Sequence, residues 1–201
     1  MTPIIAEIKP KALGRSLSAE EVAEYARTYQ SCGACAISVL TEPLHFRGSL
    51  DNLRLARATA DLPVLRKDFI NDVRQIREAP ADLVLLIASL GVDLERFVEE
   101  IRSWGAEPLV EVHDRYEMEM ALKTDADIIG INNRDLRTLE VDIGTFERLA
   151  PLARDAGVFL VAESGISTRA EALRMTRAGA DALLVGSALM QDPTALARLN
   201  R

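Results

Sequence analysis

Short apolar runs alternate with amphipathic stretches along the whole chain. Eight runs have the length and composition of buried strands, and they lie at 4–8, 34–40, 63–69, 81–87, 108–113, 127–132, 158–164 and 181–187. In most of these runs the apolar residues follow one another without alternating with polar ones. This is the pattern of a strand in a parallel sheet that is covered on both faces. The pattern therefore predicts a parallel sheet covered by helices.

The stretches between these runs have helical periodicity. Ser18 and Glu21 open the first of them with the spacing of a capping box. The predicted helices are 18–33, 49–60, 71–80, 93–105, 114–124, 144–157, 167–179 and 187–199. Several end in glycine, as helices with left-handed caps do: Gly33, Gly105, Gly157 and Gly179. Eight strand–helix units in 201 residues predict a single-domain (β/α)₈ TIM barrel over residues 1–201.

Composition and charge narrow the function. Hydrophobic residues make up 48% of the chain and charged residues 27%, a globular mixture with material for a sizeable core. A net charge of −7 argues against a nucleic-acid partner, which normally needs a basic face. The longest apolar run, 83–92, is too short for a membrane helix, and no secretory signal opens the chain. We expect a cytoplasmic protein with no membrane association.

Cys32 and Cys35 have C-x-x-C spacing but lie between a predicted helix and a predicted strand. A redox pair would open a helix, where the thiol pKa is lowered, and a zinc site would need a second pair of ligands. We interpret both as reduced structural thiols. No G-x-G-x-x-G motif follows the first strand, so a dinucleotide cofactor is not indicated.

Charged residues interrupt the apolar pattern at the carboxyl ends of the predicted strands, where barrel enzymes place catalytic groups. They are Glu7, Lys9, Lys67, Glu111, Arg134 and Glu163. Side chains alternate along a strand, so Lys67 points inward if Leu65 does. The same alternation links Glu111 to Leu109 and Glu163 to Val161. A structural charge network would explain any one of these residues, but six charges from five strands predict a site for a charged ligand.

Two turns combine small residues with strand ends, ESGIST at 163–168 and VGSALM at 185–190. Backbone N–H groups at such turns hold phosphate, and in these barrels the loops after the seventh and eighth strands often do so. The two turns therefore indicate a phosphate site.

The chain resembles the indole-3-glycerol phosphate synthase family in motifs that cover nearly all of it. They are AEIK (6–9), HFRGS (45–49), LRKDF (65–69), LVEVH (109–113), IGINNRDL (129–136), VAESGI (161–166) and VGSALM (185–190), in the family's order and spacing. The resemblance implies a step of tryptophan biosynthesis. The ring of 1-(2-carboxyphenylamino)-1-deoxyribulose 5-phosphate closes onto the ribulose carbonyl carbon, and CO₂ and then water leave. It implies neither a metal nor an organic cofactor.

The resemblance also implies catalytic roles. Lys67 would be the general acid of ring closure, beside the carbonyl oxygen that gains negative charge. Glu111 and Glu7 would supply the acid and the base of dehydration. Lys9 would hold the substrate carboxylate or donate a second proton. Asn132 would orient Glu7 or the substrate hydroxyls.

The remaining matches are binding positions. Arg134 would bind the substrate or would be structural, with Glu163 or Glu111 as its partner. The other residues are Glu163 and Ser164 for the substrate, Phe46 and Phe69 as walls around its aromatic ring, and Gly165, Gly186 and Ser187 for its phosphate.

Two departures from the family bear on activity. The family usually carries an N-terminal extension whose helix covers the top of the barrel, whereas the first predicted strand here begins at residue 4. Without that cover, water would reach the site and weaken binding. The loop after the first strand usually contains Ser-Pro-Ser, where this chain has Ala12-Leu13-Gly14. One phosphate donor is therefore lost, with Arg15 or Ser16 as a replacement.

Other interpretations stay open. Phosphoribosylanthranilate isomerase or a lyase like the tryptophan synthase α chain would share the barrel. The isomerase, however, has a cysteine near the end of its first strand, where this chain has Glu7 and Lys9. A non-catalytic or weakly active barrel that binds a phosphorylated ligand would need no acid–base set. We interpret His113 as a polar lining residue. We expect a monomer, with other enzymes of the pathway as the candidate protein partners.

Overall fold

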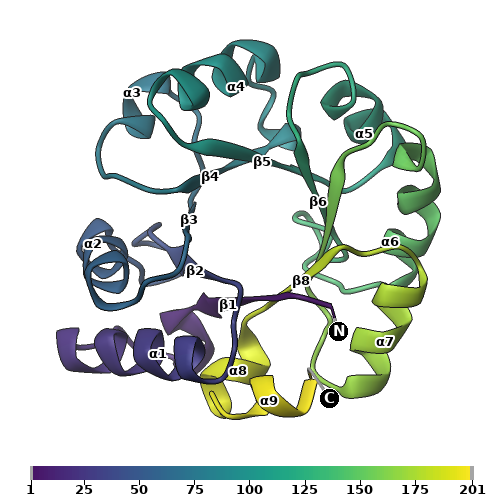
Figure 1. Ribbon diagram of the computed structural model, residues 1–201. Coiled ribbons are helices and arrows are strands. Elements are labelled where there is room, and N and C mark those ends of the chain that lie inside the picture. Colours follow the sequence, from purple (N-terminus) through teal and green to yellow (C-terminus); the bar gives the residue numbers. More distant parts are fainter. Residues whose placement is uncertain (1, 200–201) are drawn as a thin grey trace.

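The computed structural model describes residues 2–199 and contains a closed barrel of parallel strands, each paired with its neighbours in chain order (Figure 1). The strands are β1 Ile4–Ile8, β2 Ala36–Leu40, β3 Val64–Lys67, β4 Leu83–Ile87, β5 Glu107–Val112, β6 Ile128–Asn132, β7 Phe159–Glu163 and β8 Ala182–Val185. β1 closes the barrel against β8, with Ile5 opposite Leu184. The predicted (β/α)₈ barrel is confirmed.

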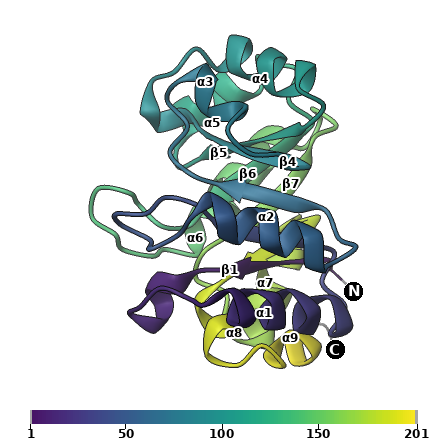
Figure 2. The same ribbon diagram turned by 90° about the vertical axis from the view of Figure 1, so that its left-hand side faces the viewer.

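Helices surround the barrel on its outer side (Figures 1 and 2). They are α1 Ala19–Ser31, α2 Leu50–Thr59, α3 Val73–Ile76, α4 Leu94–Ser103, α5 Arg115–Ala121, α6 Gly144–Leu149, α7 Arg169–Arg177, α8 Ser187–Gln191 and α9 Ala195–Leu199, with the 3₁₀ turns η1 Pro10–Leu13, η2 Ala88–Leu90 and η3 Ala150–Ala153. The predicted capping box of Ser18 and Glu21 opens α1. Across the described residues, no helix is long and apolar enough to cross a membrane.

Three predicted helices differ most from their expected ranges. The stretch 144–157 changes from α6 to η3 around Pro151, and 187–199 divides into α8 and α9 at Pro193. Proline lacks the N–H that continues a helix and disfavours helical backbone in the preceding residue. α3 ends at Ile76 instead of Pro80, and the carbonyl of Gln75 accepts hydrogen bonds from Arg66 and from the N–H of Glu78.

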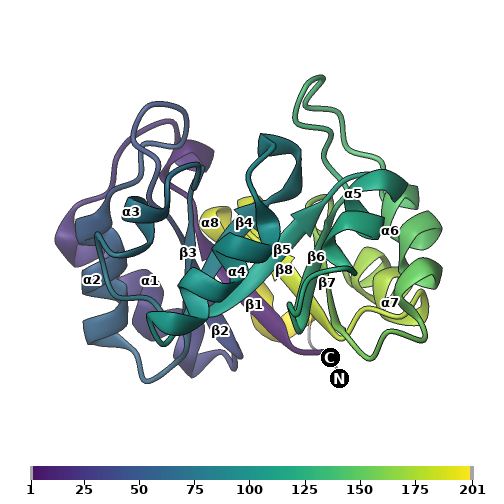
Figure 3. The same cartoon turned by 90° about the horizontal axis from the view of Figure 1, so that it is seen from above.

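Two apolar cores form on the two faces of the strands. The smaller one fills the barrel and includes Leu65, Leu109 and Val161. The larger one lies between the strands and the surrounding helices. The loops after β2 and β6 project from the same side of the barrel (Figure 3). These loops follow the carboxyl ends of the strands, so they lie around the predicted site.

Candidate active site

Lys67 lies inside the barrel between two carboxylates. Its Nζ is 2.6 Å from Oε2 of Glu111 and 2.8 Å from Oε2 of Glu163. These side chains come from β3, β5 and β7, two positions after the inward Leu65, Leu109 and Val161. The alternation predicted from the sequence therefore brings three of the candidate residues together. Both carboxylates are at most 2% exposed.

Charge is distributed unevenly over this triad. Burial opposes the ammonium of Lys67, but Glu111 and Glu163 raise its pKa above the usual range. Burial also opposes ionisation of Glu111, yet Lys67 and His113 hold its pKa below the usual range. Burial raises the pKa of Glu163 to about 8, against the influence of Lys67 and with that of Glu111. At neutral pH the triad therefore holds a cation, a carboxylate and a carboxylic acid.

Glu7 and Lys9 lie side by side, as their spacing on β1 predicts. Nζ of Lys9 is 3.4 Å from Oε2 of Glu7. Oε1 of Glu7 and Oε1 of Glu163 are buried, and neither has a hydrogen-bond partner within residues 2–199. Buried polar atoms are normally paired, so these two oxygens are candidate hydrogen-bonding groups for a bound molecule.

Two glycines provide the space for these carboxylates. A Cβ added at Gly130 would overlap Oε1 of Glu163, and one added at Gly186 would overlap Oε2 of Glu7. Gly186, predicted for the phosphate, thus also makes room for Glu7. Sequence reasoning missed Gly130. Its signal was an isolated glycine in an apolar run, which marks a close approach of other atoms.

The two predicted aromatic residues also come together. The ring centroids of Phe46 and Phe69 are 6.0 Å apart. Nζ of Lys9 and Nζ of Lys11 lie 5.6 Å and 5.3 Å from the Phe46 centroid. An aromatic wall with two cations beside it suits an aromatic carboxylate. Sequence reasoning missed Lys11, a second basic residue two positions after Lys9.

Asn132 contacts a different carboxylate from the one expected. Its Nδ2 donates to Oε1 of Glu111 at 3.1 Å, so the prediction that it orients Glu7 is wrong. Asn132 ends β6, which pairs directly with β5, and this places its side chain beside Glu111.

The prediction that Arg134 pairs with Glu163 or Glu111 is also wrong. Its guanidinium donates to the carbonyl oxygen of Leu139 at 2.7 Å, and it forms no ion pair with Glu163 or Glu111. Arg134 lies beyond the end of β6, where it bridges to Val141 within the β6–α6 loop. Its side chain follows that loop and stabilises it.

The two turns predicted to bind phosphate differ in backbone conformation. Ser164 and Gly165 both have left-handed conformations, with φ of 63° and 77°. Ser187 is the first residue of α8, directly after Gly186. The altered loop of β1 lies beside it, since Nε2 of Gln191 donates to the carbonyl oxygen of Ala12 at 3.2 Å.

One of the two expected replacements for the lost serine, Arg15, is engaged elsewhere. Nη1 of Arg15 donates to Oε2 of Glu21 at 2.8 Å and to the carbonyl oxygen of Ser16 at 3.1 Å. Arg15 therefore contacts the start of α1 in this structure.

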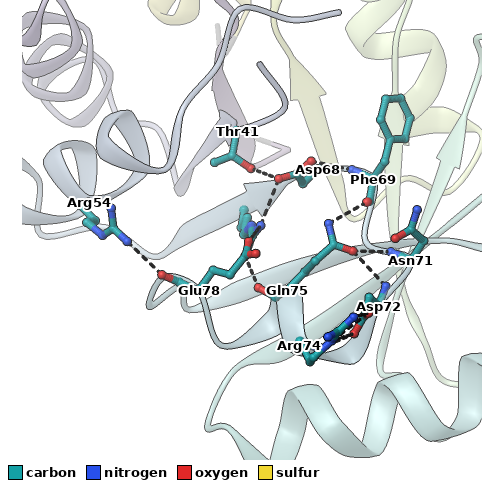
Figure 4. A network of polar contacts seen from close by, with 10 residues as sticks. Thr41, Arg54, Asp68, Phe69, Asn71, Asp72, Arg74, Gln75 and Glu78 are labelled. Atoms are coloured by element: carbon teal, nitrogen blue, oxygen red, sulfur yellow. Dashed lines mark hydrogen bonds and ion pairs between the residues drawn. The ribbon is translucent and has the colours of Figure 1, made fainter. Parts of the chain in front are cut away.

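A second polar network lies behind Lys67, on the outer face of β3. Nη2 of Arg66 is 2.9 Å from Oε2 of Glu78 and 3.1 Å from Oδ2 of Asp68. Thr41 donates to Asp68 at 2.6 Å, and Figure 4 shows these contacts joining the ends of β2 and β3 to Glu78. Gln75 donates to the carbonyl oxygen of Phe69 at 3.3 Å. The network therefore fixes the backbone on both sides of Lys67. In the sequence, this network was indicated only by Arg66 and Asp68, the two charged residues that flank Lys67 in the 63–69 run.

The cysteines lie apart from the site. Cys32 caps the end of α1 and Cys35 immediately precedes β2, as predicted, and both are free thiols. In the part of the chain that the structure describes, no group of three or more His, Cys, Asp or Glu side chains is arranged to hold a metal ion.

Comparison with known proteins supplies the family. The family model described as indole-3-glycerol phosphate synthase matches residues 1–200. A protein of that name from Halobacterium salinarum is 52% identical over 96% of this chain and 77% of its own length. Another from Haloarcula marismortui is 47% identical over 96% of this chain and 73% of its own length, and one from Carboxydothermus hydrogenoformans is 44% identical over 94% and 75%.

A solved structure adds the fold alone. It is an N-acetylmannosamine-6-phosphate 2-epimerase from Clostridium perfringens, with a TM-score of 0.71, 16% identity, and coverage of 96% of this chain and 90% of that one. The sequence relatives and the family model agree with the motifs that run from β1 to the β8–α8 turn. The chain belongs to the indole-3-glycerol phosphate synthase family.

Proposed function

We propose that this chain converts 1-(2-carboxyphenylamino)-1-deoxyribulose 5-phosphate into indole-3-glycerol phosphate, CO₂ and water. The main support is the ammonium of Lys67, held between the buried carboxylates of Glu111 and Glu163 in a member of this family. A cation with two acids, one of which keeps a proton at neutral pH, has the components of an acid–base site.

Ring closure uses Lys67. The ring carbon that bears the carboxylate bonds to the ketone carbon, and the ketone oxygen takes a proton from the ammonium of Lys67. Loss of CO₂ from that ring carbon then restores the aromatic electrons. Glu111 and Glu163 keep Lys67 protonated before the reaction, and general acids of this kind contribute roughly 10²–10⁴-fold in rate.

Dehydration uses the carboxylates. The new hydroxyl leaves as water after it receives a proton, and the adjacent carbon of the new ring loses one. We assign these transfers to Glu111 and Glu7, which lie on opposite sides of the barrel in β5 and β1. Asn132 holds Glu111 in place, and Glu163 binds the sugar hydroxyls.

The rest of the substrate meets complementary groups. The aromatic ring packs against the wall formed by Phe46 and Phe69, and its carboxylate faces Lys9. The phosphate is bound at the two turns after β7 and β8, through the N–H groups of Gly165, Gly186 and Ser187, with Ser164 beside them. Arg134 keeps the β6–α6 loop in position at the edge of the site.

The reaction itself is the test. Purified chain is mixed with the substrate, and formation of the indole product is followed by fluorescence. We expect turnover in the wild type and in Lys123→Ala, whose exposed lysine lies on the outside of the barrel, and none in Lys67→Ala. Binding of substrate without turnover by the wild type would contradict the proposal and favour a non-catalytic phosphate-binding barrel.

We also propose that the enzyme acts as a monomer in the cytoplasm. The groups named above all come from one chain, so the site needs no partner subunit. Its phosphorylated substrate is an ion that does not cross membranes unaided. Light scattering of the purified chain should give a mass of about 22 kDa, the mass of one chain.

A further inference from the structure

His113 lies between two carboxylates at the edge of the site. Its Nδ1 is 2.9 Å from Oε2 of Glu117, and its backbone N–H donates to the same oxygen at 2.8 Å. Its Nε2 lies 3.2 Å from Oε1 of Glu111. The imidazole therefore connects a carboxylate on α5 with a carboxylate inside the barrel.

This placement selects one protonation state. Glu117 needs a proton on Nδ1, and a neutral ring would then aim the lone pair of Nε2 at the Glu111 oxygen. Within the described chain, Nε2 has no hydrogen-bond partner, so nothing else would relieve that repulsion. A protonated ring faces both carboxylates with positive charge. Burial opposes this state, but Glu111 and Glu117 raise the pKa of His113 to about 9.

Other nearby charges do not reverse this preference. Backbone N–H groups of Thr138 and Arg137 lower the pKa of Asp135, and His113 makes a smaller contribution to the same shift, so Asp135 adds a third negative charge on this side of the ring. Lys67 contacts the other oxygen of Glu111, at 2.6 Å. The turn η2, which packs against β5 and α5, consists of Ala88, Ser89 and Leu90 and carries no charge.

We propose that His113 and Glu117 form a positioning pair for Glu111. The imidazolium of His113 keeps Glu111 ionised and turned toward Lys67, and Glu117 keeps the imidazole protonated and fixed. This inference rests on the proposed function, because it assigns the pair to a carboxylate of that reaction. It replaces the interpretation of His113 as a simple lining residue.

The contacts around Glu111 explain how the pair acts. Oε1 faces His113 and Asn132, whereas Oε2 faces Lys67. A proton that reaches Glu111 cancels its charge and leaves the imidazolium beside a neutral acid. That state is unfavourable, so Glu111 returns the proton quickly and is ready for another turnover.

The first measurement is a histidine titration by NMR, which does not depend on activity. The chain has two histidines, so the ring signal of His113 is the one that disappears in His113→Gln. We expect it to titrate near pH 9. In Glu117→Gln or Glu111→Gln the midpoint should fall by about one pH unit or more, because one neighbouring charge is lost. Glutamine at 117 still accepts from the His113 N–H.

The second measurement is kcat against pH. In His113→Gln we expect the acid limb to move up by about one pH unit, with kcat about tenfold lower at a pH on that limb. KM should change by less than about threefold, because His113 does not touch substrate. Glu117→Gln should show a smaller shift in the same direction. Glu119→Gln, an exposed residue of the same helix, should match the wild type.

Two results would overturn the positioning pair. One is a His113 midpoint at or below the ordinary value for histidine, and the other is an unchanged kcat profile in a folded His113→Gln variant. An inactive wild type would contradict the proposed function instead. In that case the titration of His113 in Glu111→Gln still decides whether the two groups are coupled.

Discussion

Arg66 and Lys67 are consecutive residues of β3, and each is a cation between two acids on opposite faces of the strand. Outside the barrel, Arg66 lies 3.1 Å from Asp68 and 2.9 Å from Glu78. Inside it, Lys67 lies 2.6 Å from Glu111 and 2.8 Å from Glu163. The arrangement is alike, but the surroundings differ.

The acids of the outer network are more fully satisfied and more solvated. Asp68 accepts from Thr41 and from the N–H of Phe69, and Glu78 is 47% exposed to water. The acids of Lys67 are at most 2% exposed, and Oε1 of Glu163 has no partner within residues 2–199. Arginine keeps its proton at any ordinary pH, whereas lysine can release one. The outer cation therefore fixes the strand, and the inner one is available for chemistry.

The largest effect should come from Lys67→Arg, which keeps the charge and removes the transferable proton. We expect kcat to fall by about 10²–10⁴-fold in the fluorescence assay, the usual contribution of a general acid. Circular dichroism would show that the fold is kept. Near wild-type kcat in this variant would mean that Lys67 supplies charge alone, like Arg66.

Arg66→Met should instead reduce stability. Removing Arg66 takes a charged donor from Asp68 and from the carbonyl of Gln75, and we expect a cost of about 1–3 kcal/mol of unfolding free energy. Urea unfolding measures this. Arg115→Met is the matched control, because its ion pair with Glu119 is exposed and long at 3.7 Å, and it should change stability by no more than about 0.5 kcal/mol. Equal losses of unfolding free energy in the two variants would contradict the structural role of Arg66.

Gly130→Ala tests the space around the inner acids. The new Cβ would overlap Oε1 of Glu163 and Cδ2 of Leu109, so we expect a loss of about 1–3 kcal/mol together with reduced kcat. In Gly144→Ala the new Cβ meets only the ends of the Arg148 and Asp142 side chains, which can move aside. That control should be close to wild type in both measurements.

The same two faces of β3 show what the sequence could predict. The apolar runs revealed all eight strands, because a strand buried on both faces leaves a continuous signal. Alternation then placed Lys67, Glu111 and Glu163 inside the barrel. Helix ends were less predictable, since α3 ends beside a carbonyl that Arg66 contacts from another element.

The partners of the polar residues were the least predictable part. Arg134 was assigned an acid inside the barrel, but its own loop provides a nearer carbonyl at Leu139. Asn132 was expected to orient Glu7 or the substrate hydroxyls, but pairing of β5 with β6 brings it to Glu111. Such contacts depend on loop paths and strand register, which spacing along one chain does not specify.

The two faces should also differ in the pH dependence that Glu163 adds to stability. Its pKa is about 8 in the folded chain, where burial is the largest cause, against about 4.3 for an unperturbed glutamate. Between these values the folded state binds a proton that the unfolded state has lost, so stability falls as pH rises through this range. Glutamine does not titrate, so Glu163→Gln should lack this fall.

The measurement is the unfolding free energy of both proteins at pH 5.5 and pH 9. Even one pH unit of pKa difference corresponds to about 1.4 kcal/mol, so the variant should gain on the wild type by a measurable amount as pH rises. Parallel pH curves would mean that Glu163 is ionised in the folded chain. Lys67 would then sit between two charged carboxylates, and the inner triad would resemble the outer network of Arg66 more closely than its burial indicates.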